Sequence, residues 1–182
     1  CSSDLYPLRF IDAESLPSVT IGQYTIDLTP LTHRVPSFAY RFTESTIKSY
    51  LDFEKLAQHN IPRGSIWGQL VKGEDVVFGG KVLKSRDFTN YSHPPRRIII
   101  AGDNSEPEKL TEFSRDCHAL VHEATYAKEL AVQAKEYGHS YAELVAQFAE
   151  KTQINNLVLT HFSPRYRAEL NADTSIEQLR SE

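Results

Sequence analysis

The chain contains no methionine and only two cysteines among its 182 residues. Cys1 and Cys117 provide neither a C-x-x-C metal motif nor a disulfide framework, so we expect a reducing, cytoplasmic environment. No apolar run approaches the roughly 18 residues that a membrane helix requires, and no secretory signal pattern is present. A chain that begins at Cys1 without an initiator is expected to be truncated, with a processed lipoprotein start as the alternative.

The remaining composition predicts a globular protein with an uneven charge distribution. Hydrophobic residues make up 40% of the chain and charged residues 24%, which is typical of a folded, soluble domain. The net charge of −4 argues against a nucleic-acid partner. Residues 48–97, however, contain nine Lys or Arg and five acidic residues, a local excess of +4. This segment is typical of an RNA-contacting element, and ordinary surface scatter is the alternative.

Hydrophobic patterning divides the chain into a sheet-forming start, an irregular middle and a regular end. Residues 19–28 alternate as two strands around Gly22, and residues 37–43 predict a further strand. Residues 44–95 contain a helical pattern at 47–59 and then many glycines and prolines. We expect this middle stretch to be a poorly buried arm or insertion.

From residue 96 onward, strands and helices alternate in a pattern typical of an α/β layer. The predicted strands are residues 97–101, 117–121 and 156–159. Capping boxes at 105–108 and 140–143 predict two helices, the first reaching about Arg115 and the second burying Leu144, Val145 and Phe148. A helical pattern over residues 126–137 stops at Gly138.

Ionisable side chains follow these three strands where each strand ends. Asp103 follows the first strand, His122 and Glu123 end the second, and His161 follows the third. Ligands and metals collect at the carboxyl ends of strands in α/β folds. Adding His33 and His139 gives nitrogen and oxygen donors without cysteine, a set suited to Zn²⁺ or Mn²⁺ with an open position for water. Structural hydrogen bonding, helix capping or surface ion pairing are the alternatives for each residue taken singly.

Five segments together resemble the ribonuclease Z family. The resemblance covers roughly residues 5–167. Its five segments are Thr-His-Phe-Ser-Pro-Arg-Tyr at 160–166, His-Glu-Ala-Thr-Tyr at 122–126, Gly-His-Ser at 138–140, Ile-Ala-Gly-Asp at 100–103, and His-Arg-Val-Pro-Ser-Phe-Ala-Tyr-Arg at 33–41. In the middle stretch, residues 60–65 are similar to the family's Gly-x-Pro-x-Gly-Pro arm signature, with the first glycine and last proline replaced. Asn104 and Tyr141 stand where the family has threonine.

The resemblance implies that residues 1–182 are the C-terminal half of a metallo-β-lactamase αββα sandwich, an α/β fold, with residues 44–95 as its substrate-binding arm. It implies a zinc-dependent endoribonuclease that removes the 3′ trailer from precursor tRNA. Two Zn²⁺ ions are implied per complete site, with Mn²⁺ as the alternative, and a homodimer without membrane association when the protein is complete.

The resemblance also implies a role for each matching residue. The metal ligands would be His33, Asp103 and His161, with Asp103 bridging. Catalysis would involve His139 as general acid, Glu123 as its partner and His122 as a support. Substrate contacts would come from Pro62, Arg63, Gly64, Lys72, Ser163 and Arg165.

One family motif, His-x-His-x-Asp-His, is absent from these 182 residues. Because that motif provides most of the family's metal ligands, we expect the chain to be inactive alone. Two other classes of function stay open. One is a different metallo-β-lactamase-fold phosphodiesterase or sulfatase-like hydrolase, and the other is a non-catalytic RNA-binding relative.

Overall fold

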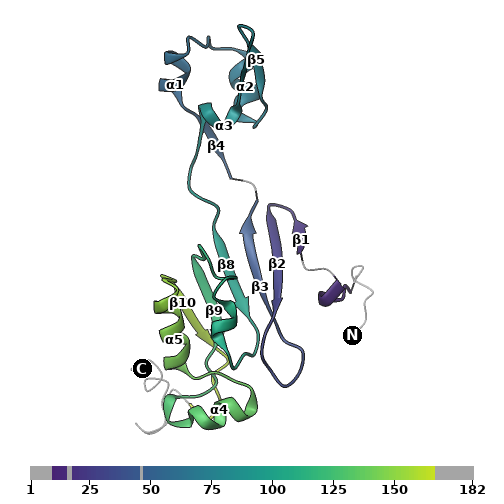
Figure 1. The fold of residues 1–182 in the computed structure, drawn as a ribbon, viewed down its shortest axis with the longest axis vertical. Coiled ribbons are helices and arrows are strands. Elements are labelled where there is room, and N and C mark those ends of the chain that lie inside the picture. Colours follow the sequence, from purple (N-terminus) through teal and green to yellow (C-terminus); the bar gives the residue numbers. More distant parts are fainter. Residues whose placement is uncertain (1–9, 16–17, 46, 167–182) are drawn as a thin grey trace. The chain divides into compact units, whose positions relative to one another are not determined.

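The computed structural model describes residues 10–15, 18–45 and 47–166, so Cys1 lies outside the described residues. The chain forms two compact units (Figure 1). Unit 1 comprises Cys1–Glu44 with Arg96–Glu182, and unit 2 comprises Ser45–Pro95. Within the described ranges, no helix has the length and apolar character needed to cross a bilayer.

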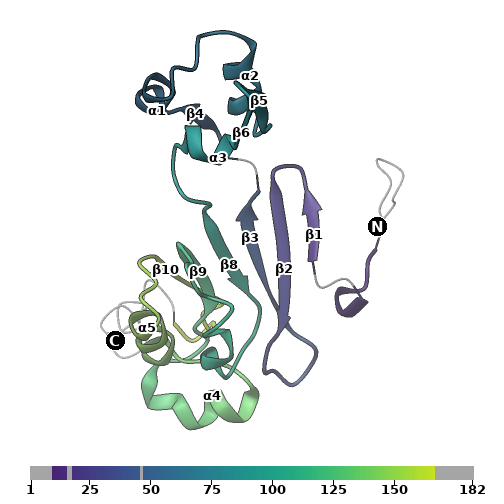
Figure 2. The same cartoon turned by 45° about the horizontal axis from the view of Figure 1, so that its top comes forward.

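Unit 1 is built on a six-stranded mixed sheet, visible in Figures 1 and 2. Its strands, in spatial order, are β1 (Ser18–Ile21), β2 (Tyr24–Pro30), β3 (Phe38–Glu44), β8 (Arg97–Ala101), β9 (Ala119–Glu123) and β10 (Leu157–Thr160). β1, β2, β3 and β8 pair antiparallel, whereas β8, β9 and β10 pair parallel. The predicted turn at Gly22 is confirmed, with φ of 59° in the left-handed region that glycine adopts freely.

One face of this sheet carries the core of unit 1. Ala39, Ile99 and Leu120 lie on neighbouring strands and are fully buried. They belong to one apolar cluster with Phe148 and Ala149 of α5 (Ala142–Lys151). The helix therefore covers the face formed by alternate residues of β3, β8 and β9.

The opposite face of the sheet exposes apolar side chains. In the antiparallel pair of β3 and β8, Tyr40 lies opposite Ile100. In the parallel pairs, Ile100 of β8 lies beside Val121 of β9, and Val121 lies beside Val158 of β10. Their side chains share a face because alternate strand residues point the same way. Tyr40 is 38% exposed, Ile98 42%, Ile100 45% and Val158 48%. A continuous apolar stripe thus crosses β3, β8, β9 and β10 without a covering layer among the described residues.

The predicted helix from Ser105 to Arg115 is wrong. The structure has only a 3₁₀ turn, η2 (Pro107–Leu110), and Glu106 stands at its N-cap without a side-chain cap. The Ser105 hydroxyl donates to the carbonyl of Thr32 instead, at 3.2 Å. A tertiary hydrogen bond has replaced the capping bond that the sequence pattern predicts, and the chain then turns toward β9, which begins two residues later than expected.

The second capping box is also wrong, although its helix is present. The N-cap of α5 is Tyr141, one residue later than the pattern predicts, and it makes no side-chain cap. The Ser140 hydroxyl precedes the helix and donates to the carbonyl of Asn104 at 2.6 Å. Leu144 is only partly buried, whereas Val145 and Phe148 are buried as predicted. The helical segment that precedes α5 comprises η3 (Lys128–Leu130) and α4 (Ala131–Tyr137). A further 3₁₀ turn, η1, spans Ala13–Ser15 near the start of the described residues.

Unit 2 has its own small core, contrary to the expectation of a poorly buried excursion. Leu56, Leu70 and Phe88 are among the buried residues of one apolar cluster. Its elements are β4 (Ser49–Leu51), α1 (Phe53–Gln58), α2 (Ser65–Val71), β5 (Val76–Phe78), β6 (Lys81–Leu83), α3 (Ser85–Phe88) and β7 (Thr89–Tyr91). The helix predicted over 47–59 begins only at Phe53, because β4 pairs with β7 first and the Asp52 carboxylate then caps α1.

The exposed stripe predicts self-association of the chain. Replacing Ile98 and Ile100 together by threonine keeps β-branched residues in β8 while removing apolar surface. We expect concentration-dependent association of the unsubstituted chain by sedimentation equilibrium, and a clear reduction in the double variant. Val77→Thr, an equally β-branched change at a 71% exposed strand position of unit 2, is the matched control. A monomeric unsubstituted chain at all concentrations would contradict the prediction.

Candidate metal centre

Strand direction brings the candidate residues to one edge of the sheet. β9 and β10 run parallel and end together, with Glu123 opposite Thr160. β3 runs antiparallel to β8, so its first residues lie beside the end of β8, with Ala39 opposite Ala101. The loop that precedes β3 therefore delivers His33 to the edge where β8, β9 and β10 end.

The carboxylate of Glu123 is the buried hub of this edge. The residue is 1% exposed. Its Oε1 accepts from the backbone N–H of Ser140 at 2.7 Å and of Asn104 at 3.2 Å, and lies 3.2 Å from Nδ1 of His139. Its Oε2 accepts from the amide of Thr125 at 2.9 Å and from the hydroxyl of Thr125 at 2.7 Å. Such a set of donors matches an ionised carboxylate, which can only accept.

His122 and Asn104 form a second buried pair behind this hub. His122 is fully buried, and its Nδ1 lies 2.7 Å from the carbonyl of Glu123, so Nδ1 carries the proton. Its Nε2 then accepts from the Asn104 amide at 3.1 Å. Burial lowers the pKa of His122, which favours the neutral ring. The side-chain oxygen of Asn104, Oδ1, accepts from the backbone N–H groups of Thr32 and Glu106. The pair of His122 and Asn104 therefore fixes the loop after β8.

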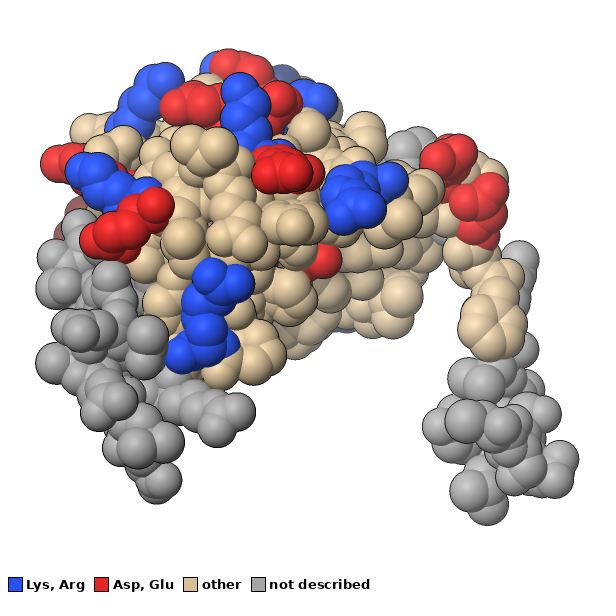
Figure 3. Space-filling model, turned by 90° about the horizontal axis from the view of Figure 1, so that it is seen from below, with Lys and Arg blue, Asp and Glu red and all other residues tan. Residues whose placement is uncertain are grey.

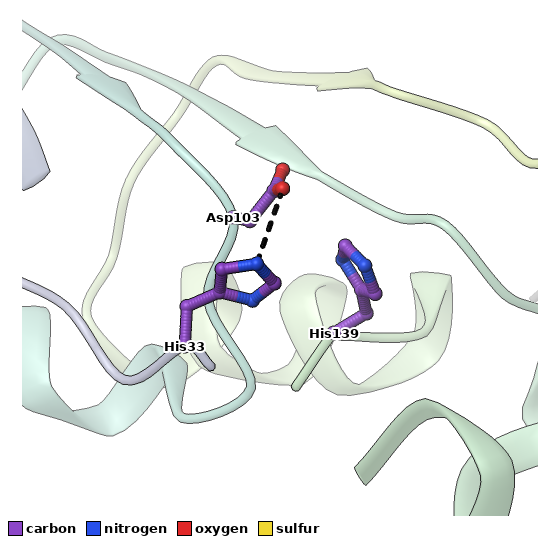
Figure 4. A group of neighbouring side chains, drawn as sticks. All are labelled: His33, Asp103 and His139. Atoms are coloured by element: carbon purple, nitrogen blue, oxygen red, sulfur yellow. Dashed lines mark ion pairs between the residues drawn. The ribbon is translucent and has the colours of Figure 1, made fainter. Parts of the chain in front are cut away.

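His33 is held with one ring nitrogen facing Asp103 (Figure 4). Its Nδ1 lies 2.8 Å from the carbonyl of Gly138, which only accepts, so Nδ1 carries a proton and Nε2 is the nitrogen that faces Asp103. Nε2 lies 3.6 Å from Oδ2 of Asp103. Gly138 has φ of 81°, and a Cβ at this position would lie 3.0 Å from Nδ1 of His33. Glycine is therefore required here both for the backbone conformation and for the approach of the ring.

The hydroxyl of Thr125 links His161 to the hub. It lies 2.9 Å from Nδ1 of His161 and 3.3 Å from Nδ1 of His139. Because this hydroxyl has one proton and donates it to Glu123, it accepts from Nδ1–H of His161. Nδ1 of His161 is therefore occupied by this hydrogen bond, which leaves Nε2 as the nitrogen for a metal ion. Nδ1 of His161 also lies 3.6 Å from Oδ1 of Asp103, so the two oxygens of that carboxylate face two different histidines.

Two overlapping sets of side chains have a geometry that could hold a metal ion. His33, Asp103 and His139 form one set, and Glu123, His139 and His161 form the other. Within each set, the potential ligand atoms lie within 4.8 Å of one another. Nitrogen and carboxylate oxygen donors suit Zn²⁺ and Mn²⁺, so the residues present fit the ion that the sequence predicts. His139 lies in both sets, whereas the sequence assigns it to proton transfer.

The candidate substrate residues fall into two groups, one in each unit. In unit 1, Nε of Arg165 donates to the hydroxyl of Ser163 at 3.1 Å, and its guanidinium lies 5.2 Å from the ring centre of Tyr126. In unit 2, Pro62, Arg63, Gly64 and Lys72 are all exposed. The Arg63 guanidinium lies 6.0 Å from the ring centre of Trp67.

Thr125, Gly138 and Asn104 have supporting roles that the sequence pattern does not indicate. All three lie within or next to the segments that carry the resemblance. Thr125 has the clearest signal, since it directly follows Glu123 and Ala124 in the quoted His-Glu-Ala-Thr run. The hydrogen-bond partners of all three come from other strands and loops, and a linear pattern does not specify them.

Comparison with solved structures identifies the fold. The metallo-β-lactamase fold protein YhfI from Bacillus subtilis aligns with a TM-score of 0.55 at 15% identity, covering 92% of this chain and 46% of that chain. No protein-family model matches the chain. The chain thus has part of a metallo-β-lactamase fold, as the sequence predicts.

Sequence comparison identifies the family within that fold. The chain is 40% identical over 178 residues to Ribonuclease Z of Pseudomonas putida strain W619, covering 97% of this chain and 56% of that relative. It is 42% identical over 185 residues to Ribonuclease Z of Marinobacter nauticus, covering 100% of this chain and 57% of that relative. The chain belongs to the ribonuclease Z family, and it spans a little over half the length of these curated relatives.

The Thr125 link predicts a measurable contribution to stability. Thr125→Val preserves shape but leaves the Oε2 of Glu123 and Nδ1 of His161 without this hydroxyl. We expect the free energy of unfolding to fall by about 1–3 kcal/mol, the cost of removing a hydrogen bond to a buried charged group; Oε2 of Glu123 keeps only the amide of Thr125. Thr125→Ser retains the hydroxyl and is the matched control. Urea denaturation measures both, and equal losses in the two variants would contradict the assignment.

Proposed function

We propose that the complete protein is a metal-dependent endoribonuclease that removes the 3′ trailer from precursor tRNA. The observation that carries this proposal is the convergence of His33, Asp103, His139 and His161 around the buried Glu123. Support also comes from the relatives, which are named Ribonuclease Z.

In this proposal, Asp103, His33 and His161 would help to hold two metal ions. The support is geometric: Nε2 of His33 lies 3.6 Å from Oδ2 of Asp103, and His161 belongs with Glu123 and His139 to the neighbouring set of potential ligands. Zn²⁺, or Mn²⁺ as the alternative, would lower the pKa of a water and balance charge on the phosphate. Because the chain lacks the His-x-His-x-Asp-His motif, we propose that it binds zinc weakly and does not cleave precursor tRNA by itself.

His139 is the proposed proton donor to the leaving oxygen. Its Nδ1 faces Glu123, whose carboxylate lies 3.2 Å away and orients the ring. Nε2 is then the atom that would hold and release the proton. His122 is fully buried and would act by positioning Asn104 and the loop that carries Asp103, without touching substrate.

Unit 2 is the proposed contact with the body of the tRNA. Basic side chains gather there around a pocket of about 470 Å³ between α1 and the β6–α3 segment, with Lys55, Lys81, Lys84 and Arg86 among its lining residues. By contrast, acidic and basic side chains are interspersed among the described residues on the face drawn in Figure 3. We therefore propose that unit 2 contacts phosphates, which contribute affinity that decreases with salt.

Substitution at the proposed centre should separate ligation from proton transfer in the complete enzyme. Asp103→Asn should abolish turnover, because it removes the negative charge with which this side chain would hold metal. His139→Ala should lower kcat by about 10²–10⁴ with little change in KM, the range expected for loss of a general acid. Steady-state kinetics on precursor tRNA measures both. Wild-type kcat in the His139→Ala variant would contradict the proposed proton donor.

Removing charge from unit 2 should affect tRNA affinity without affecting chemistry. In the complete enzyme, Lys81→Ser, Lys84→Ser and Arg86→Ser together should raise KM for precursor tRNA and reduce its dependence on salt. Hydrolysis of a small phosphodiester should continue at the unsubstituted rate.

The matched control for this experiment removes three positive charges from unit 1. Lys109, Arg115 and Lys151 each form an exposed ion pair, and serine at these positions should leave KM nearly unchanged. An equal rise in KM in both triple variants would show a general charge effect and would contradict a dedicated role for unit 2.

A further inference from the structure

A second feature of unit 1 adjoins the candidate metal centre. A pocket of about 360 Å³ is lined by His33, Arg34, Val35, Tyr126, Tyr137 and His139. His33 and His139 belong to the proposed centre, with ring centres 5.0 Å apart. The other four residues have no role in the chemistry described above.

The walls of this pocket combine aromatic rings with an unpaired cation. Tyr126 is 7% exposed, and its ring centre lies 5.2 Å from the guanidinium of Arg165 and 6.2 Å from the ring centre of His139. Tyr137 is 41% exposed at the end of α4. Arg34 is exposed, and its guanidinium has no hydrogen-bond or ion-pair partner among the described residues. Aromatic rings that stack bases, together with arginine, are typical of sites for single-stranded nucleic acid.

The backbone around Gly138 fixes these walls relative to one another. Gly138 directly follows Tyr137, and its carbonyl accepts from Nδ1 of His33. A Cβ on Gly138 would lie 3.3 Å from both the amide nitrogen and Cγ of Arg34. The end of α4 and the loop before β3 are therefore in direct contact, which places Arg34 and Tyr137 together before any ligand binds. A preformed site of this kind binds with little ordering cost.

We propose that this pocket is a subsite for the nucleotide next to the scissile phosphate of the RNA. Tyr137 stacks on the base, Tyr126 forms the rigid wall, and Arg34 contacts the phosphate. The subsite must lie within one nucleotide of the cleaved bond, because His139 lines the pocket and also faces the leaving oxygen in the proposed reaction. This inference rests on the proposed function for its orientation along the RNA.

The test measures binding to the metal-free chain and requires no cleavage. The probes are a three-nucleotide oligoadenylate and the same oligonucleotide with an abasic central position, titrated by NMR. We expect the base-bearing probe to bind more tightly and to shift the ring signals of Tyr137 and His139. Tyr137→Ala should raise its Kd about 5- to 150-fold, the range for loss of one stacked base, and should leave the abasic probe unaffected. Arg34→Gln should weaken both probes alike.

Two matched variants complete the design. Tyr137→Phe keeps the aromatic face and should bind as the unsubstituted chain does. Tyr24→Ala removes a similarly exposed tyrosine, 39% accessible on β2, and should change neither Kd. Equal affinity for the two probes, an unchanged Kd in Tyr137→Ala, or an equal loss in Tyr24→Ala would overturn the subsite. A complete enzyme that binds in this way but cleaves no precursor tRNA would instead contradict the proposed function.

Discussion

The carboxylate of Glu123 is the interaction on which the candidate centre depends. It accepts backbone hydrogen bonds from the loop after β8, from the loop after β9 and from the residue after His139. Three segments distant in sequence are thus fixed by one buried anion. An uncompensated buried charge is costly, so each donor stabilises the others' positions. The same carboxylate orients His139 directly and His161 through Thr125.

Sheet topology provides the second constraint. Three parallel strands bring their carboxyl ends to one edge, but they do not account for His33, which precedes β3. The antiparallel pairing of β3 with β8 places that loop at the same edge. The contact between His33 and Gly138 then joins it to the α4–α5 turn. The centre therefore requires both the parallel and the antiparallel halves of the mixed sheet.

Unit 2 is stabilised by its own apolar cluster, whereas the candidate centre is held together by a buried hydrogen-bond network. Its short helices and strands enclose a small apolar cluster of their own, so it does not depend on the main sheet for burial. Its basic residues surround a surface pocket, where long-range attraction to phosphates needs no buried network. In the proposed function, this division would separate affinity from chemistry, because phosphate contacts position a nucleic acid without taking part in bond cleavage.

Much of the fold was predictable from local pattern. Strand alternation, the turn at Gly22 and the end of α4 at Gly138 depend on neighbouring residues, and the structure confirms them. Both capping boxes failed because each serine stands one residue before the N-cap, where its hydroxyl donates to the carbonyl of a distant loop. The core of unit 2 was missed because its apolar residues are spread over six short elements without a clear period.

The sequence by itself determined which side chains are available for chemistry, since Asp103, Glu123 and His161 stand at the ends of periodic strands. Only the tertiary structure decided how they are arranged. The tautomer of His33 depends on a carbonyl 105 residues away, and that of His161 on a hydroxyl 36 residues away. Pairing of this kind follows from strand register and close packing, which fix distances between residues that no local pattern relates.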